Sequence, residues 1–186
     1  VDLLPEPGGP EGYRAAGEVG PYQYWRGKAR WDADTRAGPL TGGVMLDHDG
    51  DFRAEAGYEQ AKGFVKLGRE LDSGGLEIGL AATVLDQETA GFIQGQNAYR
   101  DPVLRRENLN PEAYRDADSQ RLYARWVAAD EHDWAGTDLR FFLRRSSMDF
   151  LQHFLPGKPR EENSQVSGGV MALRQRALPG GGAAAL

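Results

Sequence analysis

The sequence predicts an all-β fold, an antiparallel up-and-down meander of about seven strands. Apolar and polar residues alternate in stretches of about ten residues, the period-two pattern of a strand whose two faces differ. Glycine is abundant, with 25 residues, which fits a fold of many turns and thin strands rather than a helix-rich core. The connections between the stretches are alternately short and long.

The first 71 residues of the chain contain three such stretches. In residues 22–31, tryptophan, glycine and alanine alternate with tyrosine, lysine and arginine. In residues 40–46, leucine, glycine and valine alternate with threonine, glycine and methionine. In residues 58–71, alanine, glycine, valine and leucine alternate with tyrosine, glutamine, lysine and phenylalanine. Each stretch is predicted to be a strand with one apolar face.

The rest of the chain adds four more predicted strands. Residues 76–85 show the clearest alternation, with leucine, isoleucine and valine against glutamate, glycine and threonine. Residues 121–128 and 137–145 alternate apolar residues with arginines, and residues 166–176 form a weaker seventh stretch. A helix would need three- and four-residue spacing, which only residues 111–125 show, at their start.

Alternating connection lengths narrow the fold class further. The short connections are 33–39, 72–75, 130–136 and 179–182, and the long ones are 47–57, 86–118 and 147–163. Outer-membrane barrels combine tight periplasmic turns with longer extracellular loops, so the lengths predict a partial wall of a large outer-membrane β-barrel. About seven strands hardly close a pore, whereas large transporters use about 22. We therefore expect a piece of a longer wall.

The cationic residues of the predicted strands recur on one face. Arginine facing lipid at the bilayer midplane costs about 2–4 kcal/mol. We therefore expect these rows to face the barrel lumen: Arg26, Lys28 and Arg30; Arg121 and Arg125; Arg140 and Arg144.

Composition predicts how the chain divides into segments and excludes some kinds of partner and metal site. The domains are predicted as an unpaired N-terminal segment (1–21), a partial barrel (22–178) and a Gly/Ala tail (179–186). A net charge of −6 argues against general nucleic-acid binding, so we expect no nucleic-acid partner. The absence of cysteine excludes disulfides and thiolate metal sites.

Four stretches carry motifs of one kind of protein: LDQETAGFIQG (85–95), AYRDP (98–102), NLNPEAYRDA (108–117) and MDFLQHFLPG (148–157). Together they resemble the barrel of TonB-dependent outer-membrane receptors. The resemblance implies a parent protein of the Gram-negative outer membrane that binds and imports a ferric siderophore or similar small-molecule complex. Its partners would be outer-membrane lipid and the TonB system, which acts through a plug. Neither plug nor TonB box is expected in this stretch, so the chain alone should not transport.

The longest predicted connection holds the candidate ligand-binding residues. Guanidinium groups and aromatic rings suit an anionic, ring-bearing ligand such as a ferric chelate. The alternative is that these side chains pack the connection against its neighbours. The candidates are Tyr99, Arg100, Arg105, Arg106, Tyr114 and Arg115, with His153 from the next long connection.

No metal, cofactor or enzyme chemistry is predicted. Asp47, Asp49 and Asp51 resemble the start of a calcium loop, but its twelfth position is Tyr58 rather than glutamate. Serines, histidines and aspartates are present without a Gly-x-Ser-x-Gly elbow. A soluble antiparallel β-sheet that binds a ligand or partner on its polar face is the second hypothesis, and a small hydrolase is the third.

Overall fold

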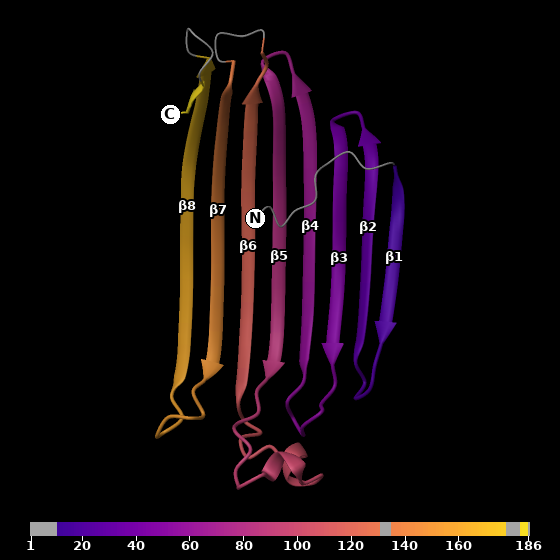
Figure 1. Cartoon of the computed structure of the whole chain (residues 1–186), viewed down its shortest axis with the longest axis vertical. Helices are drawn as coiled ribbons and strands as arrows, with labels where there is room; N and C mark the ends of the chain where they lie inside the picture. Colours follow the sequence, from indigo (N-terminus) through magenta and orange to yellow (C-terminus); the bar gives the residue numbers. More distant parts are fainter. Residues whose placement is uncertain (1–10, 131–134, 178–182, 186) are drawn as a thin grey trace.

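The computed structural model describes residues 11–130, 135–177 and 183–185. It confirms the all-β prediction, with one antiparallel sheet whose strand order follows the chain from β1 to β9 (Figure 1). The strands are β1 (Gly12–Val19), β2 (Trp25–Thr35), β3 (Gly38–Asp49), β4 (Tyr58–Leu71), β5 (Gly74–Glu88), β6 (Tyr114–Ala128), β7 (Thr137–Leu151), β8 (Arg160–Ala177) and β9 (Ala183–Ala185). The sheet forms a single curved layer that does not close on itself.

The seven expected strands are all present, and most are longer than their patterns indicated. β4 matches its predicted bounds, whereas β8 begins at Arg160 rather than at residue 166. The helical start expected in residues 111–125 is wrong, because β6 begins at Tyr114 and pairs with β5 along its length. The backbone pairing of both neighbours extends these strands past the point where the side-chain alternation weakens.

The sequence predicted that the segment 1–21 is unpaired, but part of it forms a strand. Gly12–Val19 forms β1 and pairs with β2 from Gly12 opposite Asp32 to Val19 opposite Trp25. Its small residues give little alternation, so the free backbone edge of β2 positions it. In the expected tail, Ala183–Ala185 pairs with the end of β8, and the other tail residues lie outside the described part.

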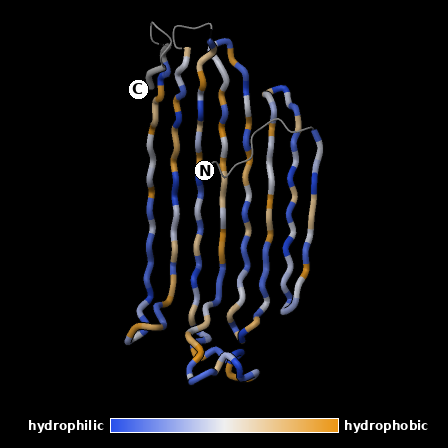
Figure 2. The backbone as a smooth tube through the Cα atoms, in the orientation of Figure 1, coloured by the Kyte–Doolittle hydropathy of each residue, from blue (hydrophilic) through white to orange (hydrophobic). Residues whose placement is uncertain are grey.

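Strand register sorts the side chains onto two unlike faces. Figure 2 shows hydrophilic and hydrophobic residues following one another along the strands. Residues directly opposite each other in an antiparallel pair share a face. The apolar face carries Trp25, Trp31, Val44, Leu46, Val65, Ile78, Leu80, Val84, Leu122, Leu139, Phe141, Leu143, Val166 and Val170. The basic face carries Arg14, Arg26, Lys28, Arg30, Lys62, Lys66, Arg121, Arg125, Arg140 and Arg144. All three predicted cationic rows therefore share one face.

Ion pairs tie the strands together on the basic face. Arg26 donates through Nε and Nη2 to Asp47 Oδ2 at 2.9 and 2.6 Å. Lys66 Nζ lies 3.1 Å from Glu77 Oε2, and Glu77 also accepts a hydrogen bond from the Tyr123 hydroxyl at 2.9 Å. These contacts satisfy charges that the sheet partly buries.

The connections differ between the two ends of the sheet. The turns at 36–37 and 72–73 close one end tightly, and the connections 50–57, 89–113 and 152–159 lie at the other end (Figure 1). The connection 129–136 belongs to the first end yet spans as many residues as 50–57. The predicted alternation thus holds for the tight turns and for 89–113, and it is not strict elsewhere.

Candidate functional site

The connection between β5 and β6 is the most elaborate part of the molecule outside the sheet. It spans residues 89–113 and contains two short 3₁₀ helices, η1 (Ala98–Arg100) and η2 (Leu104–Arg106). In Figure 1 it lies below the strand ends, at the end of the sheet that carries the longer connections. Four of the seven predicted site residues belong to it: Tyr99, Arg100, Arg105 and Arg106.

Arg53, from the β3–β4 connection, holds this segment at both ends. Its Nη1 donates to the carbonyl oxygen of Gly91 at 2.6 Å, and its Nη2 donates to the carbonyl of Glu107 at 2.7 Å. The neighbouring Ala54 N–H donates to the carbonyl of Arg106 at 3.0 Å. One guanidinium therefore joins two points of the chain that are distant in sequence.

Arg106 packs the connection against its neighbours, which was the alternative to a role in ligand binding. Its guanidinium lies 5.4 Å from the ring centroid of Tyr22 and 5.8 Å from that of Phe52. The two rings meet edge to face at 5.2 Å. Cation–π contacts of this kind bring three connections together at one end of the sheet.

Tyr99 and Arg100 form an outward-facing pair at η1. Tyr99 is 60% exposed, and its hydroxyl accepts a hydrogen bond from Arg100 Nε at 3.0 Å. The guanidinium lies 5.4 Å from the tyrosine ring centroid. Arg105 is half-buried, and its Nε makes no hydrogen bond within the described residues. These three side chains keep donors that a ligand could use.

Asp101 shapes the turn between the two short helices. The backbone N–H groups of Leu104 and Val103 donate to its Oδ1 at 3.1 and 2.8 Å. These two hydrogen bonds favour the ionised carboxyl and lower the pKa of Asp101. The turn presents Arg105 one residue beyond Leu104, so the carboxylate helps to orient that part of the candidate site.

Tyr114 and Arg115 lie on β6, not in the connection as the sequence predicted. The pairing of β6 with β5 reaches to Glu88, which shortens the connection from the expected 86–118. Tyr114 donates through its hydroxyl to Asp149 at 3.3 Å. Arg115 is exposed on the basic face opposite Phe150. Both residues therefore belong to the sheet rather than to the connection that holds Tyr99 and Arg100.

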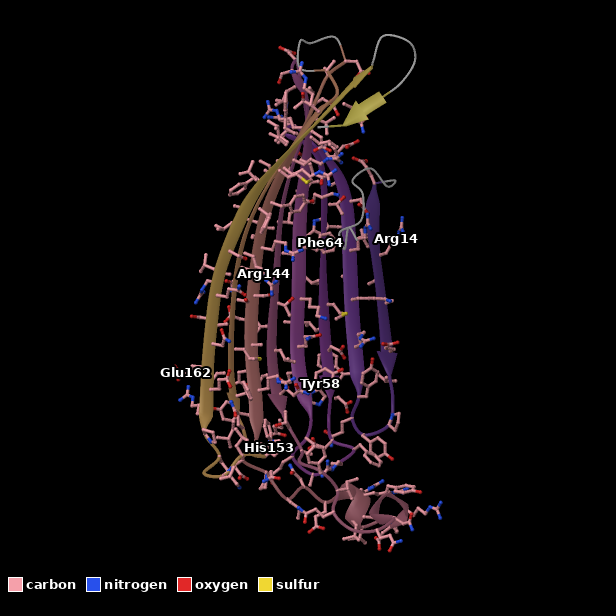
Figure 3. The ribbon with its side chains drawn as sticks, turned by 60° about the vertical axis from the view of Figure 1, so that its left-hand side comes forward. Arg14, Tyr58, Phe64, Arg144, His153 and Glu162 are labelled. Carbon is pink, nitrogen blue, oxygen red and sulfur yellow. The ribbon has the colours of Figure 1, made fainter. Side chains whose placement is uncertain are left out.

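His153 lies in the β7–β8 connection, at the lower end of the strands in Figure 3. It is half-buried and meets Phe154 edge to face, with ring centroids 5.6 Å apart. Its ring borders Gly91, near the start of the β5–β6 connection. In the same region Lys158 pairs with Glu112 and thereby lowers the pKa of that carboxyl.

Sequence reasoning missed a row of carboxylates on the apolar face, near the same end of the sheet. Five acidic side chains lie directly opposite one another across β4 to β8: Glu59, Asp86, Asp116, Asp149 and Glu162. Arg160 pairs with two of them, since it bonds Asp149 through Nε at 2.9 Å and Glu162 through Nη2 at 2.9 Å. Only the register reveals the row, because its members are far apart in sequence.

Among the described residues, no group of three or more histidine, cysteine or acidic side chains is placed to hold a metal ion. Within the same part of the chain, no helix is long and apolar enough to cross a membrane. No protein-family model, curated protein or solved structure matches the chain.

Proposed function

We propose that the sheet is part of the wall of an outer-membrane β-barrel of the TonB-dependent receptor type, whose parent binds and imports a ferric siderophore or a similar nutrient complex. The observation that carries the proposal is the contrast between the two faces. Leu80, Val84 and Val170 of the apolar face are 47%, 55% and 77% exposed. Burial of such side chains is worth about 25 cal/mol per Å², and lipid would supply it.

The sheet edges support the same proposal. The strand order ends at β1 on one side and at β8 with the short β9 on the other. Unpaired edges promote association, and barrels remove them by adding strands until the sheet closes. Further wall strands of a parent barrel would pair with both edges and leave only the two faces to be covered.

The connections give the proposed wall an orientation. The longer ones gather at one end of the sheet, which we assign to the extracellular side, where ligands arrive. Tyr99, Arg100 and Arg105 would contact an anionic, ring-bearing complex there, because guanidinium groups bind oxyanions and stack on rings. Arg106 and Arg53 would hold the connection in place.

The wall is tested with two neighbouring positions on opposite faces of β5. The chain has no cysteine, so Leu80→Cys and Ala81→Cys each give one labelling site for an environment-sensitive fluorophore. In lipid vesicles, the label at position 80 should be quenched by a nitroxide on the lipid chain, and the label at position 81 by a water-soluble quencher. Water-accessible labels at both positions in a monodisperse soluble chain would instead support the soluble ligand- or partner-binding module.

The cargo is tested separately with the ferric tris-catecholate complex as probe. Binding should quench the fluorescence of the four tryptophans in a saturable way. The double variant Arg100→Ala/Arg105→Ala should weaken binding at least tenfold, whereas Arg36→Ala, in the turn at the opposite end, should leave it unchanged. Equal binding by all three proteins would contradict the assignment of the ligand to this connection.

A further inference from the structure

A groove crosses the basic face at mid-height, away from the connections. It has a volume of about 730 Å³ and runs over β1 to β5. Figure 3 labels Arg14 and Phe64, which belong to it. A volume of this size lies within the range of about 300–1,000 Å³ that is usual for small-molecule sites.

The groove combines an apolar floor with cations. Phe64 and Met45 line its floor, and the Phe64 ring lies so close to Gly43 that a Cβ there would be 2.7 Å from it. Arg14, Lys28, Arg30 and Lys62 line the same groove, and none of its lining residues is acidic. The absence of Cβ at Gly43 is what lets the ring lie flat along the sheet.

Two of these four cations, Lys28 and Lys62, are not neutralised by an acidic side chain of the described residues. Arg30 donates to Asp32 at 2.8 and 3.0 Å, so its charge is already matched. Lys28 and Lys62 are exposed and make no ion pair within the described residues. Asp47, two residues beyond Met45 on β3, is paired with Arg26. The groove therefore presents uncompensated positive charge beside an apolar surface.

We infer that this groove binds a small amphiphilic carboxylate, with its apolar body against Phe64 and Met45 and its carboxylate between Lys28 and Lys62. The register supports this placement, because Lys28 and Lys62 both lie opposite Met45, from β2 and β4. Ammonium groups on either side of an apolar residue can hold one carboxylate while the rest of the ligand covers that residue. The inference holds for a barrel wall and for a soluble sheet alike.

Isothermal titration of the full chain with 4-phenylbutyrate tests the inference, and 4-phenylbutylamine serves as the matched ligand of opposite charge. The carboxylate should bind saturably, and the amine should bind at least tenfold more weakly. Lys28→Glu/Lys62→Glu should reduce carboxylate affinity at least tenfold. Arg144→Glu, on the same face but on β7, should change it less than twofold.

Two results would overturn the inference. Equal affinity for the two ligands would indicate adsorption to the apolar face, and unchanged carboxylate affinity in the double lysine variant would remove the cations from the site. Far-UV circular dichroism checks that each variant keeps its sheet, and Lys28→Met/Lys62→Met replaces the charge reversal if it does not. The fluorophore test at positions 80 and 81 uses no carboxylate, so the two proposals fail independently.

Discussion

The two faces of the sheet differ in what they leave unsatisfied. On the basic face, Lys66 is only 3% exposed, yet its ammonium group has Glu77 as a partner at 3.1 Å. On the apolar face, large side chains such as Leu80 and Val84 remain about half exposed. Hydrogen bonds and ion pairs can be completed within one layer, whereas apolar side chains need a second layer, a partner or lipid. The apolar face therefore leaves more of its large side chains for a second layer, a partner or lipid to cover.

Removing a buried cation from the basic face should have the largest effect. Lys66→Ala is expected to lower the free energy of unfolding by about 3–5 kcal/mol, because it removes the buried ammonium group that pairs with Glu77. Urea unfolding followed by circular dichroism measures the change. Lys62→Ala, an exposed lysine on the same strand and face, is the control and should cost about 0.5 kcal/mol or less. Similar costs for both would show that the pair contributes nothing.

A charge placed on the apolar face should be the next most costly change. Leu80→Arg is expected to destabilise the vesicle-bound chain by about 2–4 kcal/mol, because the guanidinium would face lipid. Ala81→Arg, one residue further along and on the basic face, should cost below about 1 kcal/mol. Unfolding in vesicles of fixed composition gives both values. A larger cost at position 81 would reverse the proposed assignment of the faces.

Glycine-to-alanine substitutions compare the packing of the two faces, with a smaller expected effect on stability. A Cβ at Gly79, on the basic face, would lie 2.0 Å from the ring of Tyr123, whose hydroxyl is held by Glu77. Gly79→Ala should therefore cost about 1–3 kcal/mol by overpacking. Gly27, on the apolar face, has no atom within 4 Å of such a Cβ, so Gly27→Ala should be nearly neutral. Denaturant midpoints compare the two, and an equal shift would contradict the packing argument.

Loosening the β5–β6 connection should leave both faces intact. Arg53→Ala removes hydrogen bonds to the carbonyls of Gly91 and Glu107 but touches neither face. We expect the global unfolding free energy to change by less than about 0.5 kcal/mol, while proteolysis within 89–113 becomes at least tenfold faster. Arg36→Ala should leave the cleavage rate unchanged. Unaltered proteolysis in Arg53→Ala would show that other contacts hold the connection.

The smallest effect concerns the turn at Asp101. Its lowered pKa means that the ionised carboxyl stabilises the turn fully above the pKa of an unfolded aspartate, and that this stabilisation is lost as the pH falls through the folded pKa. Amide exchange of Val103 and Leu104 should therefore rise on acidification below about pH 4. Asp101→Asn keeps an acceptor without the charge and should remove this pH dependence. Exchange that stays pH-dependent in the variant would exclude Asp101 as its source.

Two strands show what the residue pattern can and cannot predict about this sheet. The alternation in residues 58–71 predicted β4 with its bounds, because large residues mark one face of that strand throughout. β1 was missed, since the small residues Ala15, Ala16 and Gly17 at its centre weaken the contrast between its faces. The predicted positions of the candidate site residues were correct for some and wrong for others. Tyr99 and Arg100 lie in the connection as expected, whereas Tyr114 lies on β6, because backbone pairing with β5 continues beyond the alternating part.

The residue pattern alone predicts that the chain forms an antiparallel meander with one apolar and one basic face. Period-two alternation is local information, and a strand sorts its side chains by it whatever its neighbours are. Three features appear only in the folded chain, because they join residues that are distant in sequence. They are the Arg53 contacts to Gly91 and Glu107, the row of carboxylates, and the groove beside Phe64. These features depend on strand register and on the path of the connections, which bring together residues that no local pattern links.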